Sequence, residues 1–74
     1  MLRLVADEPT LTLTERQVQK LTYLVLEILP AAQCEIRRGT AAEIIVAERE
    51  PEELAPALRA RLEEIAGCRW LDAS

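Results

Sequence analysis

Residues 33–47, with the sequence QCEIRRGTAAEIIVA, decide the fold of this 74-residue chain. Between positions 33 and 38 polar and apolar residues alternate, which is typical of a strand with one buried face. The run 43–47 is rich in β-branched residues and predicts a second strand. The link 38–41 contains Gly39, whose missing Cβ permits the positive φ of a tight turn. We therefore expect a β-hairpin.

A helix is predicted on the N-terminal side of this hairpin, beginning near Thr14 and ending at Pro30. Thr14 with Gln17, or Thr12 with Glu15, has the spacing of a capping box, in which two side chains satisfy two free backbone amides. Apolar residues then recur at intervals of three and four, as the buried stripe of a helix requires. They are Val18, Leu21, Leu24, Val25, Ile28 and Leu29.

A second helix is predicted after the hairpin, because residues 50–53 place Pro51 and two carboxylates at a helix start. Gly67 is expected to end it as a left-handed cap. Pro56 leaves two alternatives open: a proline inside one helix from Pro51, which bends it, or a separate first turn and a main helix from about Ala55. The expected buried stripe is Leu54, Leu58, Leu62 and Ile65.

Two short runs at the ends of the chain complete the pattern. Residues 2–6 alternate in the manner of a strand, and residues 68–71 predict a last strand. The segment 10–13 either extends the first strand or leads into the helix. The predicted order is βαββαβ in one α+β domain, 1–74. With right-handed crossovers, this order favours the ferredoxin-like split βαβ arrangement, a four-stranded antiparallel sheet with both helices on one face.

The βαββαβ layout resembles small regulatory and assembly modules of the ferredoxin-like superfold, such as ACT-type domains and the PurS type of purine-pathway subunit. Metal-chaperone members of the superfold carry a Cys-x-x-Cys loop after the first strand, where this chain has Asp7, Glu8 and Pro9. RNA-binding members carry aromatic residues on the central strands, and positions 2–5 and 43–46 have none. Both of those functions are disfavoured.

The residue inventory argues against catalysis. The chain has no histidine, the commonest general base and a frequent metal ligand. Its two glycines are isolated, so no phosphate-cradling loop is present. Cys34 and Cys68 lack a histidine partner, and the predicted fold places them at opposite edges of the sheet. We expect two free, mostly buried thiols, no bound metal or cofactor, and no enzyme.

The formal net charge is −4, and the whole acidic surplus lies in residues 41–74. We do not expect nucleic acid as a partner, because binding to phosphate backbones depends on an excess of Lys and Arg. No apolar run is long enough to cross a membrane, and the N-terminus does not have the pattern of a signal peptide. We expect a cytoplasmic protein, and the preference for arginine over lysine suggests a GC-rich bacterial genome.

Two sets of charged residues are candidate binding sites. Glu52, Glu53, Glu63 and Glu64 are expected to form an acidic face on the second helix, either as a solvated surface or for a basic protein target. Arg59 and Glu63 have the spacing of a pair along that helix.

Arg37 and Arg38, beside Gly39, are the second set. They form either an anion site or a charged edge strand that discourages aggregation.

The open face of the predicted sheet is the strongest candidate interface. In each predicted strand, every second side chain should face the helices, and the others should form the open side of the sheet. The open side then consists of Arg3, Val5, Glu35, Arg37, Glu43, Ile45, Ala47 and one of Trp70 or Leu71. Half of these residues are apolar, more than is usual for a sheet face in water. We expect a non-enzymatic interaction or assembly module that self-associates through Val5, Ile45, Ala47, Trp70 and Leu71, as a subunit, adaptor or inhibitor of a larger complex. The alternative is a small-ligand regulatory domain with an effector near residues 7–12.

Overall fold

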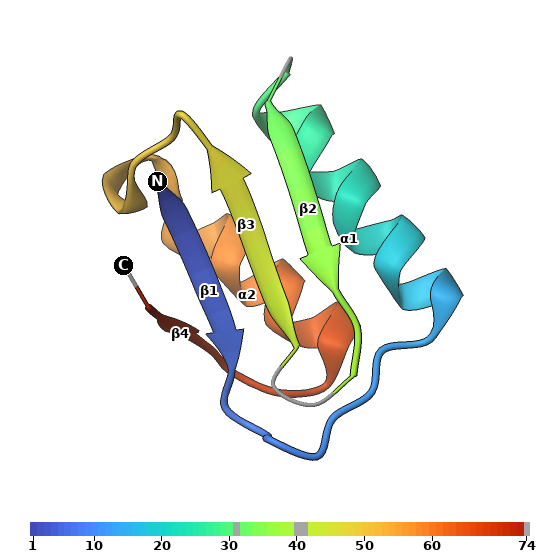
Figure 1. Cartoon of the computed structure of the whole chain (residues 1–74). Helices are drawn as coiled ribbons and strands as arrows, with labels where there is room; N and C mark the ends of the chain where they lie inside the picture. The colour runs from blue at the N-terminus through green and yellow to red at the C-terminus, as the bar shows by residue number, and fades with distance from the viewer. Residues whose placement is uncertain (31, 40–41, 74) are drawn as a thin grey trace.

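Four strands form one antiparallel sheet with the spatial order β2-β3-β1-β4 in the computed structural model of the chain (Figure 1). The structure describes residues 1–30, 32–39 and 42–73. In chain order the elements are β1 (Leu2–Ala6), α1 (Glu15–Ile28), β2 (Gln33–Arg37), β3 (Glu43–Ala47), α2 (Pro56–Ala66) and β4 (Trp70–Asp72). A single 3-10 turn, Pro51–Glu53, precedes α2.

This arrangement is the ferredoxin-like βαββαβ topology, so the predicted fold class is confirmed. Both helices lie behind the sheet in Figure 1, and the other side of the sheet faces the viewer without a covering layer. The molecule therefore has two different broad surfaces: the open face of the sheet and the outer side of the helix pair.

The core lies between the sheet and the helices. Leu2, Leu4 and Ala6 of β1 are buried, whereas Arg3 and Val5 alternate with them on the other side. The same alternation buries Ile44 and Val46 of β3. The helices contribute the opposing buried residues Leu21, Leu24, Val25, Leu58, Leu62 and Ala66. Removal of this apolar surface from water is the main stabilising contribution to a chain of this size.

The start of α1 follows the predicted capping box. The Thr14 hydroxyl accepts from the Gln17 backbone amide at 3.1 Å, and the Gln17 side-chain oxygen accepts from the Thr14 amide at 2.8 Å. Ile28, predicted in the buried stripe, is exposed. Leu29 is buried at the end of α1, where its backbone has already left helical geometry.

Pro56 does not interrupt a helix. It stands at the first turn of α2, after the N-cap Ala55, so the second alternative from the sequence is the one observed. A proline there loses no hydrogen bond, because the first amides of a helix have no intrahelical partner. Gly67 ends α2 with φ 75°, as predicted.

The hairpin also forms as predicted, with Arg37 opposite Glu43 and Gln33 opposite Ala47. Gly39 has φ 100°, while the Thr40 and Ala41 part of the predicted link lies outside the described residues. The last strand begins later than predicted, at Trp70, because Gly67 and the two residues after it make the turn out of α2. The segment 10–13 belongs to neither neighbouring element, although Leu13 is fully buried.

Candidate functional site

Strand register assembles the open face from all four strands. Ile45 of β3 has Arg3 of β1 on one side and Glu35 of β2 on the other. In the neighbouring row, Glu43 stands between Arg37 and Val5, and Val5 is followed by Leu71 of β4. We call the open face the surface formed by Arg3, Val5, Glu35, Arg37, Glu43, Ile45, Ala47 and Leu71.

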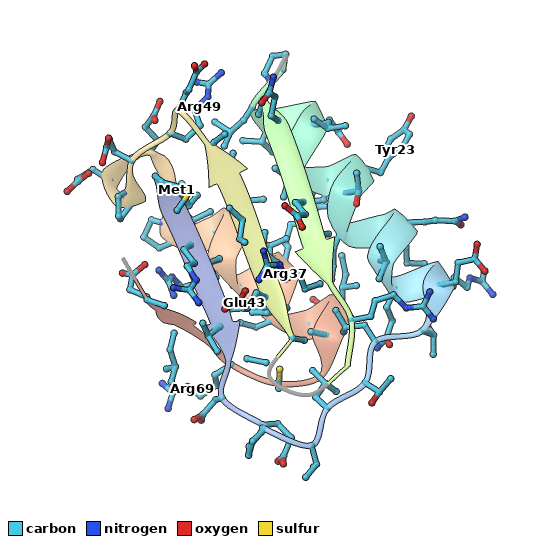
Figure 2. The ribbon with its side chains drawn as sticks, in the orientation of Figure 1. Met1, Tyr23, Arg37, Glu43, Arg49 and Arg69 are labelled. Atoms are coloured by element: carbon cyan, nitrogen blue, oxygen red, sulfur yellow. The ribbon has the colours of Figure 1, made fainter. Side chains whose placement is uncertain are left out.

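The centre of the open face is a connected group of ion pairs. Arg3 Nε donates to Glu43 Oε1 at 3.2 Å, and Arg3 Nη2 contacts the same oxygen. Arg37 Nη1 lies 3.5 Å from the other Glu43 oxygen, and Arg37 Nε lies 3.4 Å from Glu35 Oε1. Glu43 is only 8% exposed although no layer of the fold covers it, because the side chains around it take that place. Figure 2 shows Arg37 and Glu43 side by side over the sheet.

The charges on the open face balance. Two arginines and two glutamates contribute no net charge to this surface, whereas the whole chain carries −4. Each of the four side chains has an opposite charge within 4 Å. A surface with these properties can be covered without leaving an unpaired charge, which is the costly situation in a buried interface.

Apolar residues lie on both sides of the ion pairs. Val5 and Leu71 are neighbours across β1 and β4, and Leu71 is 49% exposed. Ile45 and Ala47 follow one another on the open side of β3 and are half-buried. Four of the eight residues of the open face are apolar, and the ion pairs separate these four into two parts.

Trp70 is not part of the open face, and its assignment to the interface was wrong. It lies opposite Ala6, on the helix side of the sheet, and is 1% exposed. Its indole Nε1 donates to the Leu62 carbonyl at 3.0 Å, while its backbone amide donates to Glu63 Oε2 at 3.1 Å. Arg59 Nη1 donates to the Trp70 carbonyl at 2.6 Å. Trp70 therefore holds the short strand β4 against α2.

Arg37 and Arg38 do not form a shared anion site. The Arg37 guanidinium pairs with Glu35 and Glu43 on the open face. Arg38 Nε donates to the Leu13 carbonyl at 3.2 Å and so ties the end of β2 to the segment before α1. Alternation along a strand sends neighbouring side chains to opposite faces, which separates the two cations.

The four glutamates expected to form an acidic face are divided between elements. Glu52 and Glu53 belong to the turn before α2, while Glu63 and Glu64 lie near the end of α2. A hydrogen bond from the Glu50 backbone amide, with the Arg49 guanidinium beside it, lowers the pKa of Glu53. Glu63 accepts from Trp70 instead of pairing along the helix with Arg59. These glutamates are therefore not one docking surface.

Both cysteines are free, as expected, and both are half-buried. Burial raises the pKa of the Cys34 thiol to about 11. Desolvation by burial also raises the pKa of Cys68. Thiols with raised pKa values are poor nucleophiles at neutral pH.

Local hydrogen bonds hold the loop at residues 7–12, where the alternative function places an effector. The Leu11 amide donates to the Glu8 carbonyl at 3.1 Å, and the Thr10 hydroxyl bonds to the Glu8 carboxylate at 2.9 Å. Residues 7–10 and Thr12 are exposed, so the loop is an open turn at one end of the sheet (Figure 1).

Sequence reasoning missed one group on the helix side. Arg16 and Lys20 of α1 and Arg61 of α2 line the same groove between the helices. Lys20 and Arg61 are far apart in the chain, so only the packing of α1 against α2 brings them together. The sequence does indicate part of this group, because the four-residue spacing of Arg16 and Lys20 places both on one side of a helix.

Comparison of the chain with protein-family models, curated proteins and solved structures finds no match. Within residues 1–30, 32–39 and 42–73, no three Cys, Asp or Glu side chains are grouped so that they hold a metal ion. Neither helix described by the structure has the length and apolar character needed to cross a bilayer.

Proposed function

We propose that this protein is a non-enzymatic assembly module that binds a second copy of itself through the open face. The observation that carries the proposal is the combination of partly exposed apolar residues with a fully paired, charge-neutral centre on an uncovered sheet. A chain of charge −4 opposes its own association through long-range repulsion. A neutral face is the surface on which that repulsion is smallest, and we expect the pair to act in the cytoplasm within a larger complex.

The size of the open face sets the expected strength of this association. Four strands about 4.8 Å apart and about five residues long cover roughly 300 Å² in projection. A standard stable interface buries about 800 Å² on each partner. We therefore expect a weak, concentration-dependent pair, with a dissociation constant on the order of 10–100 µM.

A matched pair of leucine substitutions tests the location of the interface. Leu71 on the open face and Leu26 on α1 are 49% and 40% exposed, so a glutamate at either position meets a similar environment in the monomer. In sedimentation experiments the wild-type mass should rise from 8.3 kDa toward twice that value with concentration. Leu71→Glu should remain at 8.3 kDa over the same range, and Leu26→Glu should follow the wild type.

Two results would overturn the proposal. If Leu71→Glu associates as the wild type does, the open face is not the contact surface. If only Leu26→Glu loses association, the helix side makes the contact.

A further inference from the structure

The groove between the helices is bounded by residues that no part of the proposed function uses. It has a volume of about 380 Å³ and is lined by Arg16, Gln17 and Lys20 of α1 and by Arg61, Glu64 and Ile65 of α2. We call this surface the helix groove. Gln17 Nε2 donates to the Ile65 carbonyl at 3.1 Å, while the other end of the same amide caps α1. A hydrogen bond thus ties the two walls of the groove together.

The cations of the helix groove differ from most others in the protein. Arg16, Lys20 and Arg61 form no ion pair with any residue that the structure describes. Most of the remaining arginines donate to a carboxylate or a backbone carbonyl; these are Arg3, Arg37, Arg38, Arg49 and Arg59. Three cations without an ion pair outnumber the carboxylates around this hollow, so it attracts a negatively charged ligand although the whole chain carries −4.

Arg16 is also placed where a helix disfavours it. It lies in the first turn of α1, and the positive end of the helix dipole opposes a cation at that position. Neither local stability nor an internal partner accounts for an arginine there. An anion in the helix groove would supply the missing compensation.

A second hollow of about 280 Å³ adjoins the first and shares Lys20, Arg61 and Ile65 with it. It adds Leu24, Glu27 and Tyr23, whose ring is 76% exposed. Figure 2 shows Tyr23 extending from α1 away from the sheet. The groove therefore has a basic part and a part with an exposed aromatic ring on which a flat group can stack.

Two carboxylates limit what the helix groove accepts. Glu64 lines the basic part and Glu27 the aromatic part, so three cations and two carboxylates leave one positive charge in excess. This balance suits a ligand with a single anionic group, and it does not suit a polyanion such as nucleic acid. Glu27 disfavours a second anionic group at the aromatic end.

We infer that the helix groove binds a small organic phosphate that carries a planar ring. The phosphate lies among Arg16, Lys20 and Arg61, where guanidinium groups donate paired hydrogen bonds to its oxygens. The ring stacks on Tyr23 over Leu24 and Ile65. This site is separate from the open face, so binding does not depend on self-association.

Titration of the full, isotope-labelled chain with adenosine monophosphate tests this inference by NMR. Amide signals of residues lining the groove should shift and saturate with a dissociation constant on the order of 0.1–1 mM. Lys20→Gln and Arg61→Gln should each weaken binding about five-fold. Arg69→Gln is the matched control, because Arg69 is exposed beside β4, lines neither hollow and should leave the affinity unchanged.

The probes separate the two parts of the ligand. Inorganic phosphate and adenosine should each bind more weakly than adenosine monophosphate. Equal binding of phosphate would overturn the role of Tyr23, and equal binding of adenosine would overturn the role of the cations. No saturable shift below about 10 mM adenosine monophosphate would overturn the site itself. The Leu71→Glu variant should bind as the wild type does, so failure of the assembly proposal leaves this test intact.

Discussion

The two broad surfaces of this small fold manage charge in opposite ways. On the open face, Arg3 and Arg37 converge on Glu43, and every charged side chain has a partner. In the helix groove, Arg16, Lys20 and Arg61 lie around a hollow without an ion-pair partner among the described residues. A surface with internally paired charges favours a partner that is also neutral. A surface with unpaired cations favours an anion.

Net charge is therefore a poor guide to what a small acidic protein binds. A value of −4 describes neither surface, because one is neutral and the other carries a local positive excess. What a surface binds depends on whether each of its charges already has a partner. That pairing is set by strand register and helix packing.

The largest expected effect is on the reactivity of Cys34, which packs against the apolar core between the two surfaces. Because the pKa of Cys34 is raised from 9.0 to about 11, its thiolate fraction at pH 8 falls from about a tenth to about a thousandth. We expect Cys34 to react with iodoacetamide roughly 10- to 15-fold more slowly than a free cysteine at that pH, because the higher nucleophilicity of the more basic thiolate offsets part of the fall in its fraction. Mass spectrometry of modified peptides over time measures the rate, and the same chain unfolded in urea is the control.

The expected pH dependence follows from the same shift. The folded-state pKa of Cys34 is raised, so the folded state favours the protonated thiol, and stability should fall as the pH rises from 9 toward 11. Equal reaction rates for folded and unfolded chain at pH 8 would show that water reaches the core beside Cys34.

Removal of the central carboxylate should make the open face resemble the helix groove. Glu43→Gln leaves Arg3 and Arg37 without their shared partner and gives each copy a positive face. We expect self-association to weaken by about ten-fold or more, with a loss of about 1 kcal/mol in unfolding free energy. Analytical ultracentrifugation and urea denaturation measure the two effects.

Glu64→Gln is the control for this change, because it alters the net charge equally but lies in the helix groove. If both variants associate to the same extent, the charge pairing of the open face has no role.

Salt should distinguish the two surfaces in a single preparation. Between about 0.02 and 0.2 M NaCl the screening length shortens from roughly 20 to 7 Å, which weakens attraction to exposed cations. We expect the affinity for adenosine monophosphate to fall about three- to ten-fold, while self-association changes less than about two-fold or strengthens slightly. Parallel titrations and sedimentation runs measure the two affinities. If salt weakens ligand binding and self-association equally, the two surfaces do not differ in charge pairing.

The smallest expected effect is a gain in stability at the expense of binding. Arg16→Glu places a carboxylate in the first turn of α1 and four residues before Lys20, and both changes favour the helix. The unfolding free energy should rise by about 0.5–1 kcal/mol. Affinity for adenosine monophosphate should fall, and a variant that loses stability would show that Arg16 has a structural role.

The sequence was sufficient for most of the fold, for identifiable reasons. Alternation in residues 2–6 and 33–38 has a period of two, so it indicates both the strand and its buried face. The Thr14 and Gln17 spacing and the positive φ at Gly67 mark helix ends through backbone chemistry that acts locally. The βαββαβ order followed from these elements.

The candidate sites were harder to predict because they depend on distant contacts. Trp70 and Leu71 are adjacent and both apolar, so alternation in a three-residue strand does not tell which one is buried. Arg38 bonds to a carbonyl 25 residues away, and Lys20 meets Arg61 only across the packed helices. None of these contacts leaves a periodic pattern in the sequence.

An isotope-filtered nuclear Overhauser experiment on a mixture of labelled and unlabelled chains locates the contact between two copies of the protein. At a concentration where the mass indicates pairing, we predict contacts between the Leu71 methyl groups of one copy and Val5 or Ile45 of the other. Intermolecular contacts at Leu26 or Tyr23 instead, or none from the sheet, would contradict the assignment of the open face as the surface that joins two copies.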